Sequence, residues 1–336
     1  MRYTRRELGK LAITAMPAAA LLRNPLELLA QPAKPNSVIN GVNIGTITYS
    51  YRSMPDQSAE ATLRYIVESG ISQIELMGGP VESFAGAPQS GRGGGPGGPG
   101  GGGGGGGRGG RGQAPTPEQQ AAQREAAERM KAWRTSVSMD KFKALRKMYN
   151  DAGVKIYAWK QLNPNMSDAE FEYIFNVAEA LGCTHTTLEL TEDAAQLKRI
   201  GDFAMKKKIY AAYHTHTQAT MTSFDQAFAL SKGNMSNIDL GHYVAGTGES
   251  PIPFLKKYHD RIASVHLKDR TTPAHGAKNL VWGTGDTPLK EILQTVKKEK
   301  YTFPLSVELE YDVPEGSDAV KEVRKCVDYC RAALTS

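Results

Sequence analysis

The feature of the sequence that most constrains its fold is a repeated alternation of short β-branched runs with helix-like segments. Several of the helical segments begin with Ser or Asp and end with Gly, as helix caps do. Eight strand and helix pairs predict a (β/α)8 TIM barrel over residues 38–334, with a doubly wound open sheet as the alternative. The predicted strands are 42–50, 72–79, 155–162, 184–191, 208–216, 237–244, 261–269 and 303–311, and clear helices include 58–70, 138–153, 167–182 and 288–300.

Residues 86–120 break this alternation, because they are dominated by glycine and carry no large apolar side chain. Glycine loses the most backbone freedom on ordering, and nothing in this tract offsets that loss, so we predict a disordered insertion. It interrupts the connection after the second strand and would emerge on the catalytic rim of a barrel, followed by a helix-like segment at 119–133. Tracts of this kind can bind RNA, but in an exported chain a flexible insertion is the favoured interpretation.

Residues 1–33 have the layout of a twin-arginine export signal. Arg5 and Arg6 precede a weakly apolar run at 11–22, and a region of small residues follows. The run contains Pro17 and is shorter than the roughly twenty apolar residues of a membrane span, so it predicts no stable anchor. We therefore expect an exported, periplasmic protein. The alternative is a basic amphipathic arm that stays attached to the chain.

The net charge of +6 is concentrated in the two segments just described, which leaves the predicted barrel close to neutral. This distribution predicts no nucleic-acid partner. The chain has three cysteines, Cys183, Cys326 and Cys330, with no paired Cys-x-x-Cys motifs, so neither a disulfide framework nor a structural zinc site is indicated. We expect Cys326 and Cys330 to be thiols in the core. The sequence leaves open whether the protein is a homo-oligomer.

The ends of the fourth to eighth predicted strands are unusually polar. Active sites of TIM barrels lie at the carboxyl ends of the strands, and alternate residues of a strand share a face, so these side chains can converge on one mouth. Carboxylates and imidazoles gathered in one pocket repel and lose hydration unless a cation lies among them. The mixture of oxygen and nitrogen predicts one divalent ion, Mn, Co, Zn or Fe, rather than calcium. The residues are Glu189, His214, His216, Asp239, His242, His266, Lys268, Asp269, Glu308 and Glu310.

Successive motifs resemble the xylose isomerase-like, sugar phosphate isomerase/epimerase family, and most of all its inosose dehydratase-like members. The motifs are YHTHTQAT at 213–220, residues 238–270 with HLKD, WGTGD at 282–286 and LSVELEYD at 305–312. The similarity runs from Val42 to the C-terminus, apart from the glycine-rich insertion. The resemblance implies that Asp239, His266 and Glu308 hold one metal ion.

The fourth metal ligand departs from the pattern of the family. Epimerases carry a Glu on the strand before the Asp strand, whereas this chain has His214 there. Either Glu189 reaches in from the fourth strand, or His214 or His216 takes the place. We give Glu189 first place, because a carboxylate keeps the charge balance. The missing Glu is also an acid/base residue of the family, so the departure bears on the mechanism.

The chemistry expected of such a centre is removal of a proton beside a carbonyl. A divalent ion that chelates a carbonyl and an adjacent hydroxyl acidifies the neighbouring carbon, and the enediolate can then isomerise, epimerise or lose a β-substituent. We predict a sugar isomerase, epimerase, dehydratase or lyase acting on a sugar or a keto-glycoside. Glu308 and His214 are the candidate bases. Lys268 and His242 are candidates to hold hydroxyls or an oxyanion, and Lys268 could instead pair with Asp269.

Three further residues, His216, Glu310 and Trp282, are candidates for additional ligands or substrate contacts. The glycine-rich 282–286 lacks the Lys-Ser/Thr of a phosphate-binding loop, so we interpret it as a tight turn before a helix that opens at Pro288. Two other functions compete. An AP-endonuclease-like metallohydrolase is disfavoured, because the second and third strands offer Glu75 and Lys160 instead of His, and because the body is not basic. A non-catalytic sugar-binding barrel is the other.

Overall fold

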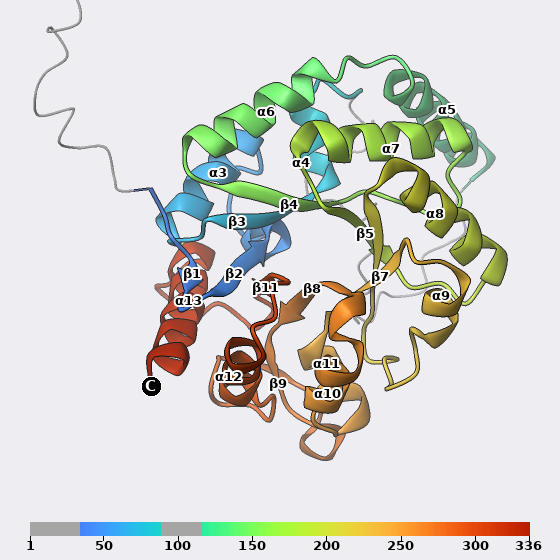
Figure 1. Ribbon diagram of the computed structural model, residues 1–336. Coiled ribbons are helices and arrows are strands. Elements are labelled where there is room, and N and C mark those ends of the chain that lie inside the picture. The colour runs from blue at the N-terminus through green and yellow to red at the C-terminus, as the bar shows by residue number, and fades with distance from the viewer. Residues whose placement is uncertain (1–33, 89–115) are drawn as a thin grey trace, which may run out of the picture. The chain divides into compact units, whose positions relative to one another are not determined.

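The computed structural model describes residues 34–88 and 116–336. The predicted export signal at 1–33 lies outside the described residues, as does 89–115 of the predicted glycine-rich insertion. In the described residues eight parallel strands close into a barrel, because the first of them pairs with both the second and the last (Figure 1). The (β/α)8 prediction is confirmed, and the open sheet is wrong. Around the barrel the strands are β2 (Val42–Ile47), β3 (Gln73–Met77), β4 (Lys155–Lys160), β5 (His185–Glu189), β6 (Tyr210–His214), β7 (Asn234–Asp239), β8 (Ile262–Leu267) and β11 (Leu305–Val307).

Helices cover the outside of the barrel (Figure 1). The four helices named from the sequence form within two residues of their predicted bounds, and the capping signals work as expected. The Ser58 hydroxyl accepts a hydrogen bond from the Ala61 amide, and Gly182 takes a left-handed conformation at the end of its helix. The outer helices are α3 (Ala59–Glu68), α6 (Asp140–Asp151), α7 (Asp168–Leu181), α8 (Ala194–Lys207), α9 (Asp225–Leu230), α11 (Ile252–Tyr258), α12 (Leu289–Glu299) and α13 (Ala319–Thr335).

Shorter elements lie at the two ends of the barrel. The hairpin strand β1 (Val38–Ile39) pairs antiparallel with β2, and the two-residue strands β9 (Asp269–Arg270) and β10 (Asn279–Leu280) pair with each other. Helix α4 (Gly78–Phe84) follows β3 directly, and α5 (Pro117–Arg134) follows the part of the chain that is not described. Short 3-10 turns lie at η1 (Thr48–Tyr51), η2 (His259–Arg261) and η3 (Pro273–His275).

The sixth strand is the clearest error of the sequence analysis. The prediction placed it at 237–244, but β7 ends at Asp239 and helix α10 (Leu240–Thr247) starts at the next residue. Apolar residues in the first turns of α10 resemble a buried strand. The Asp239 side chain turns the chain into a helix, because its Oδ1 accepts the His242 amide at 2.7 Å. His242 therefore lies in the first turn of α10 and not on a strand.

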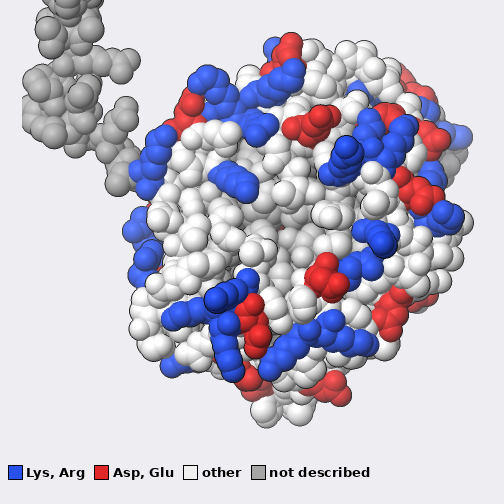
Figure 2. All heavy atoms as spheres, in the orientation of Figure 1, with Lys and Arg blue, Asp and Glu red and all other residues white. Residues whose placement is uncertain are grey.

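Apolar side chains from the strands and helices form one core, and the inside of the barrel carries buried polar groups in addition. Cys183, Cys326 and Cys330 are free and buried, which confirms the expectation of core thiols for the helical pair. On the face shown in Figure 2, basic and acidic side chains lie scattered among neutral ones. None of the described helices combines the length and the apolar character needed to cross a bilayer.

A cavity of about 650 Å³ opens at the amino ends of the strands. Its lining includes the first residues of several strands, among them Gln73, Lys155, His185 and Tyr210. The polar residues singled out from the sequence lie at the carboxyl ends, which are at the other end of the barrel. The cavity is therefore separate from the candidate site.

An ion pair joins the two flanks of the segment 89–115. Arg134, at the end of α5, donates to both carboxylate oxygens of Glu82 in α4, at 2.8 and 3.1 Å, and the Tyr173 hydroxyl donates to the same carboxylate at 3.0 Å. Helix α5 starts at Pro117, inside the range predicted as insertion, because Thr116 and Gln119 form a capping box. Most of α5 is exposed, so this pair is its main polar attachment among the contacts described.

We expect Arg134→Met to release α5 from the barrel. The Arg134 and Glu82 side chains are only 11% and 6% exposed, and removing one partner of a nearly buried pair costs roughly 3 kcal/mol because the other charge is left uncompensated. Urea unfolding measures that loss, and hydrogen exchange over 117–134 reports the release. Arg129→Met is the matched control, because the ion pair of Arg129 with Glu125 is exposed and is worth at most about 0.5 kcal/mol. Equal effects of the two substitutions would show that the buried pair does not hold α5.

Candidate metal centre

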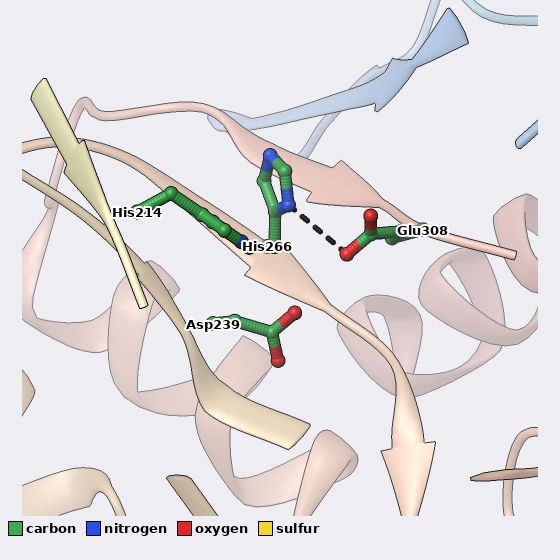
Figure 3. A group of neighbouring side chains, drawn as sticks. All are labelled: His214, Asp239, His266 and Glu308. Carbon is green, nitrogen blue, oxygen red and sulfur yellow. Dashed lines mark hydrogen bonds and ion pairs between the residues drawn. The ribbon is translucent and has the colours of Figure 1, made fainter. Parts of the chain in front are cut away.

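Four side chains from adjacent strands meet at the carboxyl end of the barrel. His214 ends β6, Asp239 ends β7, His266 lies near the end of β8, and Glu308 follows β11 directly. Each offers one ligand atom, and these atoms all lie within 4.8 Å of one another (Figure 3). All four residues are buried. The structure therefore brings together Asp239, His266 and Glu308, as the family resemblance implies, and adds His214 to them.

The His266 ring lies between two carboxylates. Its Nδ1 is 3.0 Å from Glu308 Oε2, as the dashed line in Figure 3 shows, and its Nε2 is 2.9 Å from Glu75 Oε2. Burial disfavours the charged ring, but the carboxylates of Glu308 and Glu75 outweigh it and raise the pKa of His266 to about 10. In the absence of another cation, this ring supplies positive charge to the cluster.

Lys268 supplies the other positive charge. Its Nζ lies 2.9 Å from Asp239 Oδ2, 2.9 Å from Glu308 Oε2 and 2.6 Å from Glu310 Oε2. Burial opposes the charge of Lys268, yet these carboxylates raise its pKa above the ordinary value. The alternative of an ion pair with Asp269 is wrong.

Asp239 shows that the cluster still lacks positive charge. Burial raises the pKa of Asp239 to about 7 despite the nearby ammonium of Lys268. Its Oδ2 is buried, and among the described residues its close charged contact is the Lys268 ammonium, 2.9 Å away, which Glu308 and Glu310 share. One ammonium shared by three carboxylates leaves Asp239 under-compensated, and two imidazoles and a second carboxylate lie beside it, so the donor set fits a divalent metal ion.

His214 has the form that a metal ligand requires. Its Nδ1 lies 2.9 Å from Asn237 Oδ1 and 3.2 Å from the Asn237 carbonyl oxygen, so Nε2 is the nitrogen left for the cluster. Burial lowers the pKa of His214 well below its usual range, and the ring is neutral. Two imidazoles and two carboxylates suit zinc, manganese, cobalt or iron.

Glu189, the first choice for the fourth ligand, lies in a neighbouring cluster. Its Oε1 is 2.8 Å from Lys160 Nζ, and its Oε2 is 3.5 Å from His216 Nδ1. The ligand atoms of Glu189, His214 and His216 form a second group within 4.8 Å of one another. In this structure His214, and not Glu189, belongs to the group with Asp239.

The remaining candidates divide between the mouth and the core. The His242 ring lies 4.9 Å from that of His216, and its Nε2 is 3.9 Å from Glu310 Oε2. The Arg270 guanidinium donates to His242 Nδ1, which leaves Nε2 of the neutral ring as a donor. Trp282, in contrast, belongs to the hydrophobic core and packs edge-on against Tyr329 of α13, with ring centroids 5.8 Å apart.

Sequence analysis missed four polar residues at this end of the barrel: Glu75, Lys160, Asn237 and Arg270. Glu75 and Lys160 were noted only as residues that are not histidine. A signal was present for Glu75, because it stands between the apolar residues Ile74 and Leu76, which predict a buried strand, and Glu75 is indeed fully buried. A carboxylate at such a position needs donors around it.

The WGTGD segment is a turn built around one carboxylate. Asp269 Oδ2 accepts the amides of Gly283, Thr284 and Gly285 at 2.7, 3.1 and 2.9 Å, and Oδ1 accepts the Thr287 amide at 3.3 Å. A Cβ on Gly285 would lie 2.3 Å from Asp269 Oδ1, so glycine is needed there. These amides are already bonded to Asp269, which agrees with a tight turn and not with a phosphate cradle.

We expect Asp269→Asn to destabilise this turn. The substitution places an NH2 group against backbone N–H donors, and loss of hydrogen bonds to a charged acceptor costs about 2 kcal/mol. Urea unfolding measures the change. Asp202→Asn, which removes an exposed carboxylate paired with Lys198, should change the free energy of unfolding by at most about 0.5 kcal/mol. If Asp269→Asn lowers the free energy of unfolding by no more than Asp202→Asn does, the Asp269 carboxylate does not stabilise the turn.

Comparison with known proteins gives a family match. The model of a family described as xylose isomerase-like TIM barrel matches residues 130–331, more than half of the chain. The inosose dehydratase of Clostridium beijerinckii is 31% identical over 138 residues, which are 40% of this chain and 38% of that protein. The inosose dehydratase of Lacticaseibacillus casei is 27% identical over 161 residues, 42% of this chain and 53% of that protein. The matched regions thus span about half or less of these relatives.

Solved structures extend the likeness over nearly the whole chain. A sugar phosphate isomerase/epimerase from Parabacteroides distasonis has a TM-score of 0.57 and 16% identity, and the match covers 91% of this chain and 97% of that one. The 3-keto-D-glucoside 4-epimerase of E. coli has a TM-score of 0.56 and 11% identity, over 87% of this chain and 99% of that one. At these identities the similarity shows the shared fold.

Proposed function

Because the chain belongs to the xylose isomerase-like TIM barrel family, we propose that it is a metal-dependent enzyme that removes a proton next to the carbonyl of a carbohydrate. The observation that carries this proposal is the buried group of His214, Asp239, His266 and Glu308 at the carboxyl end of the barrel. The relatives named above include a dehydratase and an epimerase of a keto-sugar. A carbonyl-bearing sugar, cyclitol or keto-glycoside is therefore the proposed substrate class.

The residues of the cluster would bind the metal ion and accept the proton from the substrate. His214 Nε2, His266 Nδ1 and carboxylate oxygens of Asp239 and Glu308 would hold the ion. A bound divalent ion polarises a carbonyl and an adjacent hydroxyl, which makes the proton on the neighbouring carbon easier to remove. The second oxygen of Glu308 is a candidate to accept that proton.

Two donors lie where negative charge would develop on the substrate. The Lys268 ammonium touches both Asp239 and Glu308, and His242 presents Nε2–H beside Glu310. Both groups are buried and fixed by their partners, so little reorganisation is needed when the charge appears. We propose that Lys268 and His242 bind substrate oxygens. His214 would then be a ligand and not a base, since its free nitrogen faces the other ligand atoms.

Isomerisation, epimerisation and elimination all begin with this proton removal, and the proposal covers the three outcomes. The AP-endonuclease-like alternative lacks support, because Lys160 pairs with Glu189 and Glu75 with His266. From the layout of residues 1–33 we also propose that the enzyme acts after export from the cytoplasm.

Metal binding should be measurable without any substrate. We expect metal-stripped protein to take up one Mn, Co, Zn or Fe ion, and its free energy of unfolding to rise by about 2.7 kcal/mol at a metal concentration a hundred times Kd. Asp239→Ala should abolish both effects, because it removes a ligand. Glu179→Ala, which removes an exposed carboxylate on α7, is the control and should leave both unchanged. If the Asp239→Ala variant still binds the metal ion tightly, the ion is held at another site.

Isotope exchange tests the reaction itself. Metal-loaded protein is incubated in deuterated water with ketoses, inososes and 3-keto-glycosides, and products are read by mass and NMR spectra. We expect deuterium at the carbon next to the carbonyl in at least one class, and none with Asp239→Ala. A protein that binds metal but exchanges no proton and forms no product with any class would be a non-catalytic barrel.

A further inference from the structure

A buried glutamate on the far wall of the barrel contacts the proposed centre without belonging to it. Glu75, on β3, is fully buried, and the mechanism above gives it no role. Its Oε1 accepts the Thr187 hydroxyl at 2.6 Å, and its Oε2 lies 2.9 Å from His266 Nε2 and 3.4 Å from Asn237 Nδ2. Burial of a carboxylate is costly, and three donors directed at this one indicate a specific function.

The contact with His266 determines which nitrogen of that ring carries hydrogen. A carboxylate surrounded by donors accepts hydrogen bonds, so the proton between Glu75 and His266 lies on Nε2. When a cation replaces the second proton of the ring, the free lone pair is then on Nδ1. Nδ1 is the nitrogen that faces Glu308, at 3.0 Å. Glu75 thus directs the ligand nitrogen of His266 toward the other ligands.

The contact with Asn237 does the same for the other imidazole. An amide has one donor end and one acceptor end, and Glu75 takes the donor end, as does the Ser264 hydroxyl oxygen, 2.6 Å from Asn237 Nδ2. Asn237 Oδ1 must then face His214 Nδ1 and accept its hydrogen. The backbone carbonyl of Asn237, which can only accept, lies 3.2 Å from the same nitrogen and requires the same assignment. His214 is left with its lone pair on Nε2.

The backbone gives independent support, because the strand register shifts at both of these residues. The β3–β4 pairing is irregular between Ile74 and Glu75, and the β7–β8 pairing between Ser236 and Asn237. Irregularities of this kind redirect a side chain and are common beside active sites. Both shifts occur at the two residues whose side chains meet inside the barrel.

We propose that Glu75 is a positioning residue that sets the hydrogen positions on both histidine ligands, directly on His266 and through Asn237 on His214. The inference rests on the proposed metal centre. Partners behind metal-binding histidines fix the ring and its tautomer, and their loss costs 10- to 100-fold in metal affinity or activity. Glu75 would be such a partner for two ligands at once, His266 and His214.

Metal affinity and the spectrum of the bound ion test this role. Competition with a chelator gives the Kd for Co²⁺, and the visible absorption of Co²⁺ reports the geometry of its ligands. Glu75→Met should weaken Co²⁺ binding about 10- to 100-fold and alter the spectrum. Glu75→Gln, which keeps one accepting oxygen, should restore most of the affinity. Asn237→Leu should weaken binding in the same range by releasing His214 alone.

The matched control is Thr187→Val. Thr187 donates to Glu75 but contacts neither histidine in the described hydrogen bonds, so its loss should change the affinity less than about threefold, by comparison with the 10- to 100-fold of a direct partner. If Glu75→Met and Asn237→Leu bind Co²⁺ with the Kd and spectrum of the unmodified protein, the inference is wrong. Equal losses for Glu75→Met and Thr187→Val would indicate a general packing effect and would also overturn it.

A direct reading of the tautomers separates this inference from the metal proposal. Long-range ¹H–¹⁵N spectra of Zn²⁺-loaded protein with labelled histidine should show hydrogen on Nδ1 of His214 and on Nε2 of His266. The opposite assignment for either ring overturns the inference even if Glu75→Met does not fold. Failure of the unmodified protein to bind Co²⁺ or Zn²⁺ would overturn the metal centre, whereas the His214 tautomer could still be read without metal.

Discussion

The structure depends on how buried negative charge is balanced at the carboxyl end of the barrel. Asp239, Glu308 and Glu75 are withdrawn from water within one small region. Each would be very costly alone, and together they would repel one another. Two positive groups offset this charge. The protonated His266 ring contacts Glu75 and Glu308, and the Lys268 ammonium contacts Asp239 and Glu308. The single ammonium of Lys268 is shared by Asp239, Glu308 and Glu310, and burial still raises the pKa of Asp239 to about 7. A divalent ion would complete the balance, and this is the physical basis of the proposed activity.

The same balance favours a neutral imidazole, His214, over a further carboxylate at the end of β6. A third anionic ligand beside Asp239 and Glu308 would add charge to a region that also holds Glu75. A neutral imidazole supplies a lone pair without that charge. The fold thus uses one carboxylate behind the ligands and an imidazole among them. The Lys160 and Glu189 pair, with His216, lies next to this centre and is partly exposed.

Much of this could be predicted from the sequence, because barrel strands and their caps leave local signals. Runs such as 155–162 and 184–191 became β4 and β5, and the polar strand ends did converge. The errors arise where the structure is determined by a contact that the local sequence does not reveal. The Asp239 side chain caps α10 where the sequence predicts the end of a strand. Lys268 pairs with Asp239, Glu308 and Glu310 instead of its sequence neighbour Asp269. Glu75 meets His266 across the barrel through a register shift, and strand alternation alone does not show such a shift. The choice between Glu189 and His214 likewise depended on Lys160, which pairs with Glu189.

The ion pair between Glu82 and Arg134 has a consequence for how the chain could be rearranged. It fastens the flanks of 89–115 to each other, so the barrel does not need the intervening peptide to hold α4 and α5 together. At another point of the molecule, Asn40 donates to the Leu334 carbonyl at 2.9 Å, which brings the start of the barrel beside its last helix. A circular permutant with Asn40 and Leu334 bridged by a short linker, and opened within 89–115, would keep the pairings among the eight parallel strands and lose the short β1–β2 hairpin.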